Sequence, residues 1–163
     1  MPSVLFVCTA NRFRSPLAAA WFSGSLKKEA DFHNWHIGSA GTWAEPGQTV
    51  FPSADWVNEH FGLDLGAHRS QRIGKDLIAG YDLILVMEKN HREALWVEFP
   101  ETKGNLFLLS EVATGLTYDI IDPGIQQPGS TFQEIAVELR DLIDKGCGNI
   151  CWLTRKLYDK KKT

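Results

Sequence analysis

A cysteine, an arginine and a serine near the N-terminus are spaced in a way that suits binding and attack of an oxyanion. Cys8 follows the apolar run 4–7, Arg14 comes six residues later, and Ser15-Pro16 is typical of a helix start. A turn that leads from a strand into a helix points backbone N–H groups inward, and the helix dipole adds about half a positive charge. We therefore predict an anion-binding loop that begins at Cys8.

The cysteine in this loop is placed to act as a nucleophile. A thiol beside an arginine at a helix N-terminus ionises readily, and a thiolate that faces a bound phosphate can form a phospho-cysteine. The planar guanidinium of Arg14 can hold two phosphate oxygens, and the Ser15 hydroxyl can donate to the Cys8 sulfur when it leaves. The alternative, in which Cys8 is a small apolar residue at a strand end, stays open.

Such a reaction also needs an acid that protonates the leaving oxygen. Asp122 is the candidate, because Pro123 stiffens its loop and Gly124 permits a turn. An Asp-Pro pair often does no more than begin a turn, so a role for Asp122 beside Cys8 is a hypothesis at this point.

The elements that must position these residues alternate between strands and helices. We expect strands at 4–7, 35–42, 81–87 and 106–109, and helices at 16–29, 53–61, from Asn90 onward and at 131–145. Asn90 with Glu93, and Thr131 with Glu134, resemble capping boxes. This order predicts an α/β three-layer sandwich with a roughly four-stranded parallel sheet, flavodoxin-like, with its ligand beyond the carboxyl ends of the strands.

Length and composition indicate one globular domain. The chain has 163 residues, 44% of them hydrophobic and 23% charged, and we expect a domain at 1–158 with a basic tail at 159–163. The net charge is -3; because the residues from Arg155 onward carry +4, the rest carries -7, which disfavours nucleic acid as a partner. We expect a monomer or weak dimer.

The sequence also bears on where the protein works. The N-terminus has no basic segment followed by a long apolar stretch, so we expect no signal peptide and no membrane insertion. The odd number of cysteines, three, favours a reducing, cytoplasmic compartment.

The segment from Cys8 to Pro16, taken with Asp122-Pro123, resembles the low-molecular-weight protein tyrosine phosphatases. The segments 39–42, 68–73 and 81–87 and Phe132 resemble the same family. The resemblance implies that Cys8 is the nucleophile, that Arg14 binds the phosphate, and that Asp122 is first the general acid and then the base. It further implies no metal or organic cofactor, and as partner a phosphorylated protein, phosphotyrosine first, or a small aryl phosphate.

The resemblance also assigns roles to the remaining loop residues. The phosphate would be bound by Thr9, Ala10, Asn11, Arg12, Phe13, Arg14 and Ser15. Four polar residues would form the network that stiffens the loop: Asn11, Ser15, Ser39 and His68. The other histidines show no metal-ligand pattern, and we expect His91 among them to be structural.

Three departures from the family pattern affect the predicted chemistry. Phe13 stands where the family usually has a second cysteine, so a protective disulfide is absent and Cys8 should reach higher oxidation states. Arg12 stands where an apolar residue or threonine is usual, which favours a substrate with extra negative charge. The segment after Pro123, at 124–127, lacks aromatic residues, and Trp43 is a possible pocket wall instead.

Two other functions compete with hydrolysis. An arsenate reductase of the same fold passes oxidising equivalents along further cysteines, but the stretch 82–100 has none, and Cys147 and Cys151 lie far downstream. A non-catalytic phosphate-binding module would keep the loop without turnover.

Overall fold

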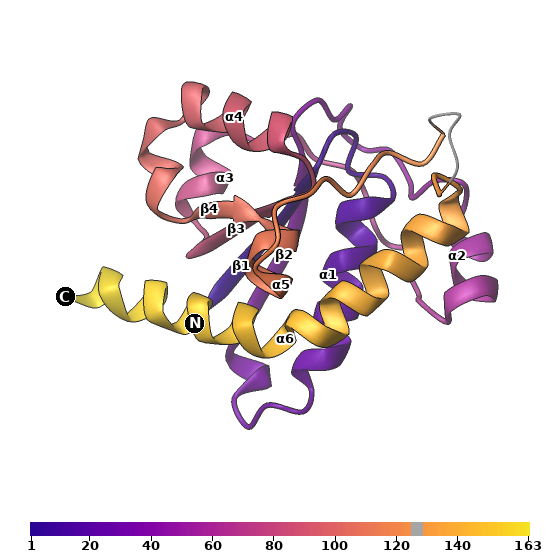
Figure 1. The fold of residues 1–163 in the computed structure, drawn as a ribbon. Helices are drawn as coiled ribbons and strands as arrows, with labels where there is room; N and C mark the ends of the chain where they lie inside the picture. The colour runs from indigo at the N-terminus through magenta and orange to yellow at the C-terminus, as the bar shows by residue number, and fades with distance from the viewer. Residues whose placement is uncertain (125–128) are drawn as a thin grey trace.

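The computed structural model describes residues 1–124 and 129–163. Its centre is a four-stranded sheet in the order β2-β1-β3-β4, and every neighbouring pair is parallel. The strands are β1 (Ser3–Cys8), β2 (His36–Gly41), β3 (Leu83–Val86) and β4 (Leu106–Leu108). The predicted fold class, an α/β sandwich with a four-stranded parallel sheet, is confirmed (Figure 1).

Helices cover both faces of the sheet. They are α1 (Arg14–Leu26), α2 (Ala54–Phe61), α3 (Lys75–Ala79), α4 (Lys89–Glu98), α5 (Leu109–Thr114) and α6 (Phe132–Lys162), with short 3-10 helices at Phe32–Asn34 and Pro100–Gly104. Successive side chains of a strand point to opposite faces, so Val4 and Phe6 pack toward α1 and α6, whereas Leu5 and Val7 pack toward α3 and α4. The result is three layers (Figure 1).

The strand order places the end of β1 at the centre of the sheet's carboxyl edge. β1 pairs with β2 on one side and with β3 on the other, and Cys8 is in register with Gly41. The chain therefore turns to opposite sides after β1 and after β3, the switch point at which open α/β sheets bind their ligands. Residues that follow β2 and β3 must meet the loop that follows Cys8.

Two helix starts differ from the prediction. Helix α1 begins at Arg14, before the expected residue 16, and Ser15 does not cap it, because its hydroxyl bonds within the loop instead. The predicted Asn90–Glu93 capping box is wrong: the box at the start of α4 is formed by Glu88 and His91.

Helix α6 is much longer than predicted. Thr131 caps it by accepting from the Glu134 amide at 3.1 Å, as expected, but the helix continues past residue 145 to Lys162 because Ile150 extends its buried stripe. Near its end, Lys161 forms an ion pair with Asp82 at 3.2 Å. In the described part of the chain, no helix has the length and apolar character needed to cross a membrane.

Candidate active site

The loop after β1 closes around the sulfur of Cys8. This residue is only 2% exposed, and its Sγ lies 3.0 Å from the Ser15 Oγ. Asn11, at the middle of the loop, has a left-handed backbone with φ 56°. Its side-chain amide donates to the Ser15 hydroxyl at 2.8 Å and to the Ser39 hydroxyl at 2.9 Å. One buried amide thus links the loop to Ser15, which contacts the Cys8 sulfur, and to Ser39 on β2.

Further bonds hold Asn11 from outside the loop. The His68 Nε2 donates to the Asn11 carbonyl at 2.8 Å, and the Gln71 amide donates to the Asn11 Oδ1 at 2.9 Å. The structure therefore brings together Asn11, Ser15, Ser39 and His68, the four residues that the family resemblance implied as one network. Gln71, which the sequence did not single out, joins them through its backbone and through its side-chain amide, which donates to the Ser39 carbonyl at 2.9 Å.

The residues after β2 bond to the backbone of the loop that begins at Cys8. The Thr42 amide donates to the Cys8 carbonyl at 2.9 Å, and the Trp43 amide donates to the Thr9 carbonyl at 2.9 Å. Gly41 has no room for a side chain, because a Cβ there would collide with the Thr9 carbonyl. A glycine at this position lets the two backbones approach closely enough to bond.

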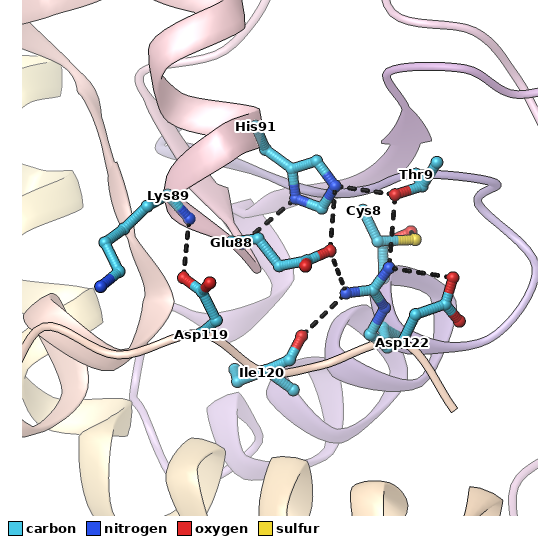
Figure 2. A network of polar contacts seen from close by, with 10 residues as sticks. Cys8, Thr9, Glu88, Lys89, His91, Asp119, Ile120 and Asp122 are labelled. Carbon is cyan, nitrogen blue, oxygen red and sulfur yellow. Dashed lines mark hydrogen bonds and ion pairs between the residues drawn. The ribbon is translucent and has the colours of Figure 1, made fainter. Parts of the chain in front are cut away.

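The guanidinium of Arg14 is buried and held from several sides. It donates to the Glu88 Oε2 at 2.7 Å and to the Ile120 carbonyl at 2.8 Å, and the Asp122 Oδ2 lies 3.7 Å away (Figure 2). Charge-assisted bonds of this length fix the orientation of a planar guanidinium. Glu88 is a residue that the sequence did not single out.

His91 is a second residue of the site that the sequence left as structural. Its Nδ1 accepts from the Glu88 amide at 3.1 Å, so its proton is on Nε2, which donates to the Thr9 hydroxyl at 2.8 Å (Figure 2). Burial, followed by the positive charge of Arg14, lowers the pKa of His91 from 6.5 to about 4. The imidazole is neutral at physiological pH and links α4 to the loop.

The two aspartates before Pro123 have different surroundings. The Asp119 carboxylate accepts a hydrogen bond from the Lys89 amide at 2.8 Å and so satisfies the first N–H group of α4 (Figure 2). The Asp122 side chain is 54% exposed and lines the cleft above Cys8. Of these two carboxylates, Asp122 is the one placed to meet a ligand there.

A cleft of about 280 Å³ opens over the loop. Its lining is formed by Cys8, Ala10, Arg12, Phe13, Arg14, Phe51, Asp122, Pro123 and Phe132. Phe13 meets Phe132 edge to face with 4.9 Å between the ring centres, and Phe51 lies 5.4 Å from the same Phe132 ring. Aromatic walls therefore come from these three residues.

The predicted wall residue Trp43 is not among the described residues that line this cleft. Its ring is 74% exposed, with the Arg72 guanidinium 4.4 Å from its centre. The non-aromatic segment predicted after Gly124 falls largely at 125–128, outside the described residues.

The other two cysteines lie on α6. The two thiols are free, and their sulfurs are 4.0 Å apart. The hydrogen bond between the thiols lowers the pKa of Cys147 and raises the pKa of Cys151. Neither lines the cleft that contains Cys8. Among residues 1–124 and 129–163, no three His, Cys, Asp or Glu side chains are grouped to hold a metal ion.

Known proteins share this architecture. A protein-arginine-phosphatase of Geobacillus stearothermophilus is 33% identical over 87% of this chain and 91% of its own. The low molecular weight protein-tyrosine-phosphatase Wzb of Escherichia coli K12 is 36% identical over 65% of this chain and 68% of its own. A solved cysteine-to-serine mutant of the YwlE arginine phosphatase, with a phosphorylated active-site serine, has a TM-score of 0.79 and 27% identity, and covers 91% of this chain and 95% of that one.

The family model for "Low molecular weight phosphotyrosine protein phosphatase" matches residues 3–162, which includes every strand and helix described above. The match extends from the strand that carries Cys8 to the last turn of α6. The chain therefore belongs to the low molecular weight phosphotyrosine protein phosphatase family and is a phosphatase.

Proposed function

We propose that this protein hydrolyses phosphotyrosine in proteins through a phospho-cysteine on Cys8, with Asp122 as general acid and base. The observation that carries the proposal is the shared cleft, in which Cys8, Arg14 and Asp122 all face one space above an anion-binding loop. The nucleophile, the cation for the phosphate and the acid for the leaving group are thus within reach of a single substrate.

In the first step, the Cys8 sulfur attacks phosphorus and the bond from phosphorus to the ester oxygen breaks. Arg14 and the backbone N–H groups of the loop stabilise the negative charge on the phosphate oxygens. Asp122 gives its proton to the departing oxygen, and the alcohol or phenol leaves. The product on the enzyme is a thiophosphate ester at Cys8.

In the second step, Asp122 takes a proton from water while the water oxygen attacks phosphorus. The sulfur–phosphorus bond breaks, inorganic phosphate is released, and the Cys8 thiolate returns. The Ser15 hydroxyl, 3.0 Å from the sulfur, can donate to this thiolate and make it a better leaving group. The phosphorylated active-site serine of the related YwlE mutant supports a covalent intermediate in this fold.

The walls of the cleft support an aromatic substrate. Phe13, Phe51 and Phe132 offer flat apolar surfaces on which a phenolic ring can stack or pack edge to face. The second candidate substrate is phosphoarginine, because the relative from Geobacillus stearothermophilus is named a protein-arginine-phosphatase. Arsenate reduction has less support, since the Cys147–Cys151 pair lies on α6 and does not line the cleft.

The proposal is tested by hydrolysis of aryl phosphates from pH 4.5 to 8 in the presence of EDTA. Wild type should turn over, Cys8→Ser should not, and Asp122→Asn should be slower, most of all with phenyl phosphate. The reason is that an acid matters most when the leaving oxygen is strongly basic, so p-nitrophenyl phosphate should suffer less. Asp119→Asn is the matched control, because Asp119 serves α4 and not the cleft.

Other outcomes would point elsewhere. An inert wild type that still binds vanadate would favour the non-catalytic module. Loss of a thiol pair on treatment with arsenate would favour the reductase. An equal loss of activity for both leaving groups in Asp122→Asn would exclude Asp122 as the general acid.

A further inference from the structure

We infer that Arg12 is a second anion-binding residue at the rim of the cleft, which selects a phosphotyrosine flanked by an acidic side chain and disfavours phosphoarginine. This inference rests on the proposed function, since it names the substrate class of the same cleft. It concerns recognition of the substrate and adds no chemical step.

The position of Arg12 is fixed by neighbouring backbone. Its carbonyl accepts from the Phe51 amide at 2.8 Å, and its Nε donates to the Thr49 carbonyl at 2.8 Å. The guanidinium carbon lies 5.4 Å from the centre of the Phe51 ring. These contacts use one donor nitrogen and one face, and among the described residues no partner is bonded to the two terminal nitrogens, whose four N–H groups can meet a ligand.

The two arginines of the cleft differ in their partners. Arg14 forms an ion pair with Glu88 at 2.7 Å and lies 3.7 Å from Asp122. Within the described ranges, no carboxylate comes within ion-pair distance of Arg12. Arg12 is therefore a cation at the rim of the cleft without a carboxylate partner among the described residues. The cleft already contains Arg14 as the cation for the phosphate.

This arrangement matches a ligand with two anionic groups. The phosphate occupies the loop above Cys8, and a carboxylate next to it in the peptide can accept two parallel bonds from the terminal nitrogens of Arg12. The ring between them lies against Phe51, which packs under the Arg12 guanidinium. A peptide with aspartate or glutamate beside the phosphotyrosine has this chemistry.

The same cation acts against phosphoarginine. In that group the phosphate is attached to a guanidine that can carry a positive charge. When the phosphate is in the loop, this charge lies in the same cleft as Arg12, and like charges placed together disfavour binding. Arg12 thus separates the two substrate classes that relatives of this protein are named for.

The experiment measures binding, so that it does not depend on turnover. The Cys8→Ser protein is titrated with two phosphotyrosine peptides that differ only in glutamate or glutamine on either side of the phosphotyrosine. We expect the acidic peptide to bind at least about tenfold more tightly, with a preference that weakens as salt increases. In Cys8→Ser/Arg12→Gln, the preference should fall to about twofold or less.

Controls separate a lost contact from a damaged loop. Arg140→Gln, an exposed arginine on α6, should keep the full preference for the acidic peptide. Binding of inorganic phosphate, which has no second anion, reports whether the loop is intact in each variant. Phosphoarginine should bind relatively better, by about tenfold against phosphotyrosine, once Arg12 is neutral.

The two proposals fail in different ways. An unchanged peptide preference in Arg12→Gln overturns the inference about Arg12, whatever the turnover. If wild type binds the acidic peptide with the Arg12-dependent preference but does not hydrolyse it, the recognition inference holds and the proposed function is wrong.

Discussion

The imidazole of His91 and the hydroxyl of Thr9 are joined by a 2.8 Å hydrogen bond that connects the start of α4 to the anion loop. Thr9 also lies 3.4 Å from a terminal nitrogen of Arg14, whose other terminal nitrogen donates to Glu88. The four residues thus form a closed ring of polar contacts next to Cys8 (Figure 2). Because Arg14 and His91 are buried and Thr9 and Glu88 are half-buried, a change in any of the four should alter the orientation of Arg14.

The lowered pKa of His91 predicts a loss of stability in mild acid. The unfolded chain takes up a proton at this residue near pH 6.5, whereas the folded protein does so only near pH 4, because of burial and Arg14. The contribution of His91 to stability is therefore complete above pH 6.5 and decreases as the pH falls toward 4, by up to about 1.4 kcal/mol per pH unit.

The measurement is urea unfolding of wild type and His91→Asn at pH 7, 6 and 5. The stability advantage of wild type should narrow with decreasing pH. His33→Asn, at an exposed histidine, is the matched control. A constant difference between wild type and His91→Asn at all three values would contradict the prediction.

Replacing Glu88 by glutamine should show whether the ion pair with Glu88 orients Arg14 for the reaction. Glutamine keeps the size of the side chain and an acceptor for the start of α4, but it cannot form the 2.7 Å ion pair with Arg14. We expect kcat for an aryl phosphate to fall about tenfold or more, since a misdirected guanidinium stabilises the transition state poorly. Inorganic phosphate should inhibit the variant at least as strongly as it inhibits wild type, because Arg14 no longer has the negative charge of Glu88 beside it.

The control for this substitution is Glu93→Gln, on the exposed side of α4. Steady-state kinetics with phosphate as inhibitor gives both quantities. An unchanged kcat in Glu88→Gln would show that the ion pair does not orient Arg14 for the reaction.

Asn11 should contribute to stability through two separable effects. Asn11→Gly keeps a residue that tolerates φ 56° but removes the bonds to Ser15, Ser39 and the Gln71 amide, at a cost of about 2 kcal/mol. Asn11→Ala removes the same bonds and also places a Cβ in a left-handed conformation, which costs about 1 kcal/mol more. Urea unfolding of both variants measures the difference; equal stability would exclude the backbone contribution.

The absence of a cysteine beside Arg14 predicts oxidation of Cys8 that thiols reverse poorly. Hydrogen peroxide converts the thiolate to a sulfenic acid, and without a neighbouring thiol the reaction continues to the sulfinic acid. In Phe13→Cys, the sulfenic acid can condense with the new thiol to give a disulfide and water. We expect dithiothreitol to restore most activity in this variant and much less in wild type.

Mass spectrometry of the oxidised proteins distinguishes the products. Cys147→Ser/Cys151→Ser is the control for thiols outside the cleft. Full recovery of wild type after prolonged peroxide treatment would contradict the prediction. Because Phe13 packs against Phe132, the variant must be compared at matched folded concentration.

Much of the fold could be predicted because its signals are local. The apolar run before Cys8, the Thr131–Glu134 cap and the stripe of α6 each depend on residues a few positions apart. The length of α6 could not be predicted in the same way, because beyond residue 145 its stability comes from packing and from the ion pair of Lys161 with Asp82.

The site was predicted in part, and the missed residues share a cause. Asn11, Ser15, Ser39 and His68 were expected from the resemblance, and the structure brings them together. Glu88 reaches Arg14 because β3 pairs with β1, and strand order cannot be inferred from spacing along the chain. One local signal was present, since Glu88 and His91 stand three residues apart at a helix start.

Two of the three aromatic walls of the cleft, Phe51 and Phe132, come from parts of the chain outside the loop that begins at Cys8. Phe51 precedes α2 and is 44% exposed, and Phe132 opens α6. The loop itself is fastened by buried bonds within the strand edge. Substitutions at the two outer walls can therefore change which substrates are accepted while the reaction centre stays intact, so new specificities are accessible to evolution in single steps.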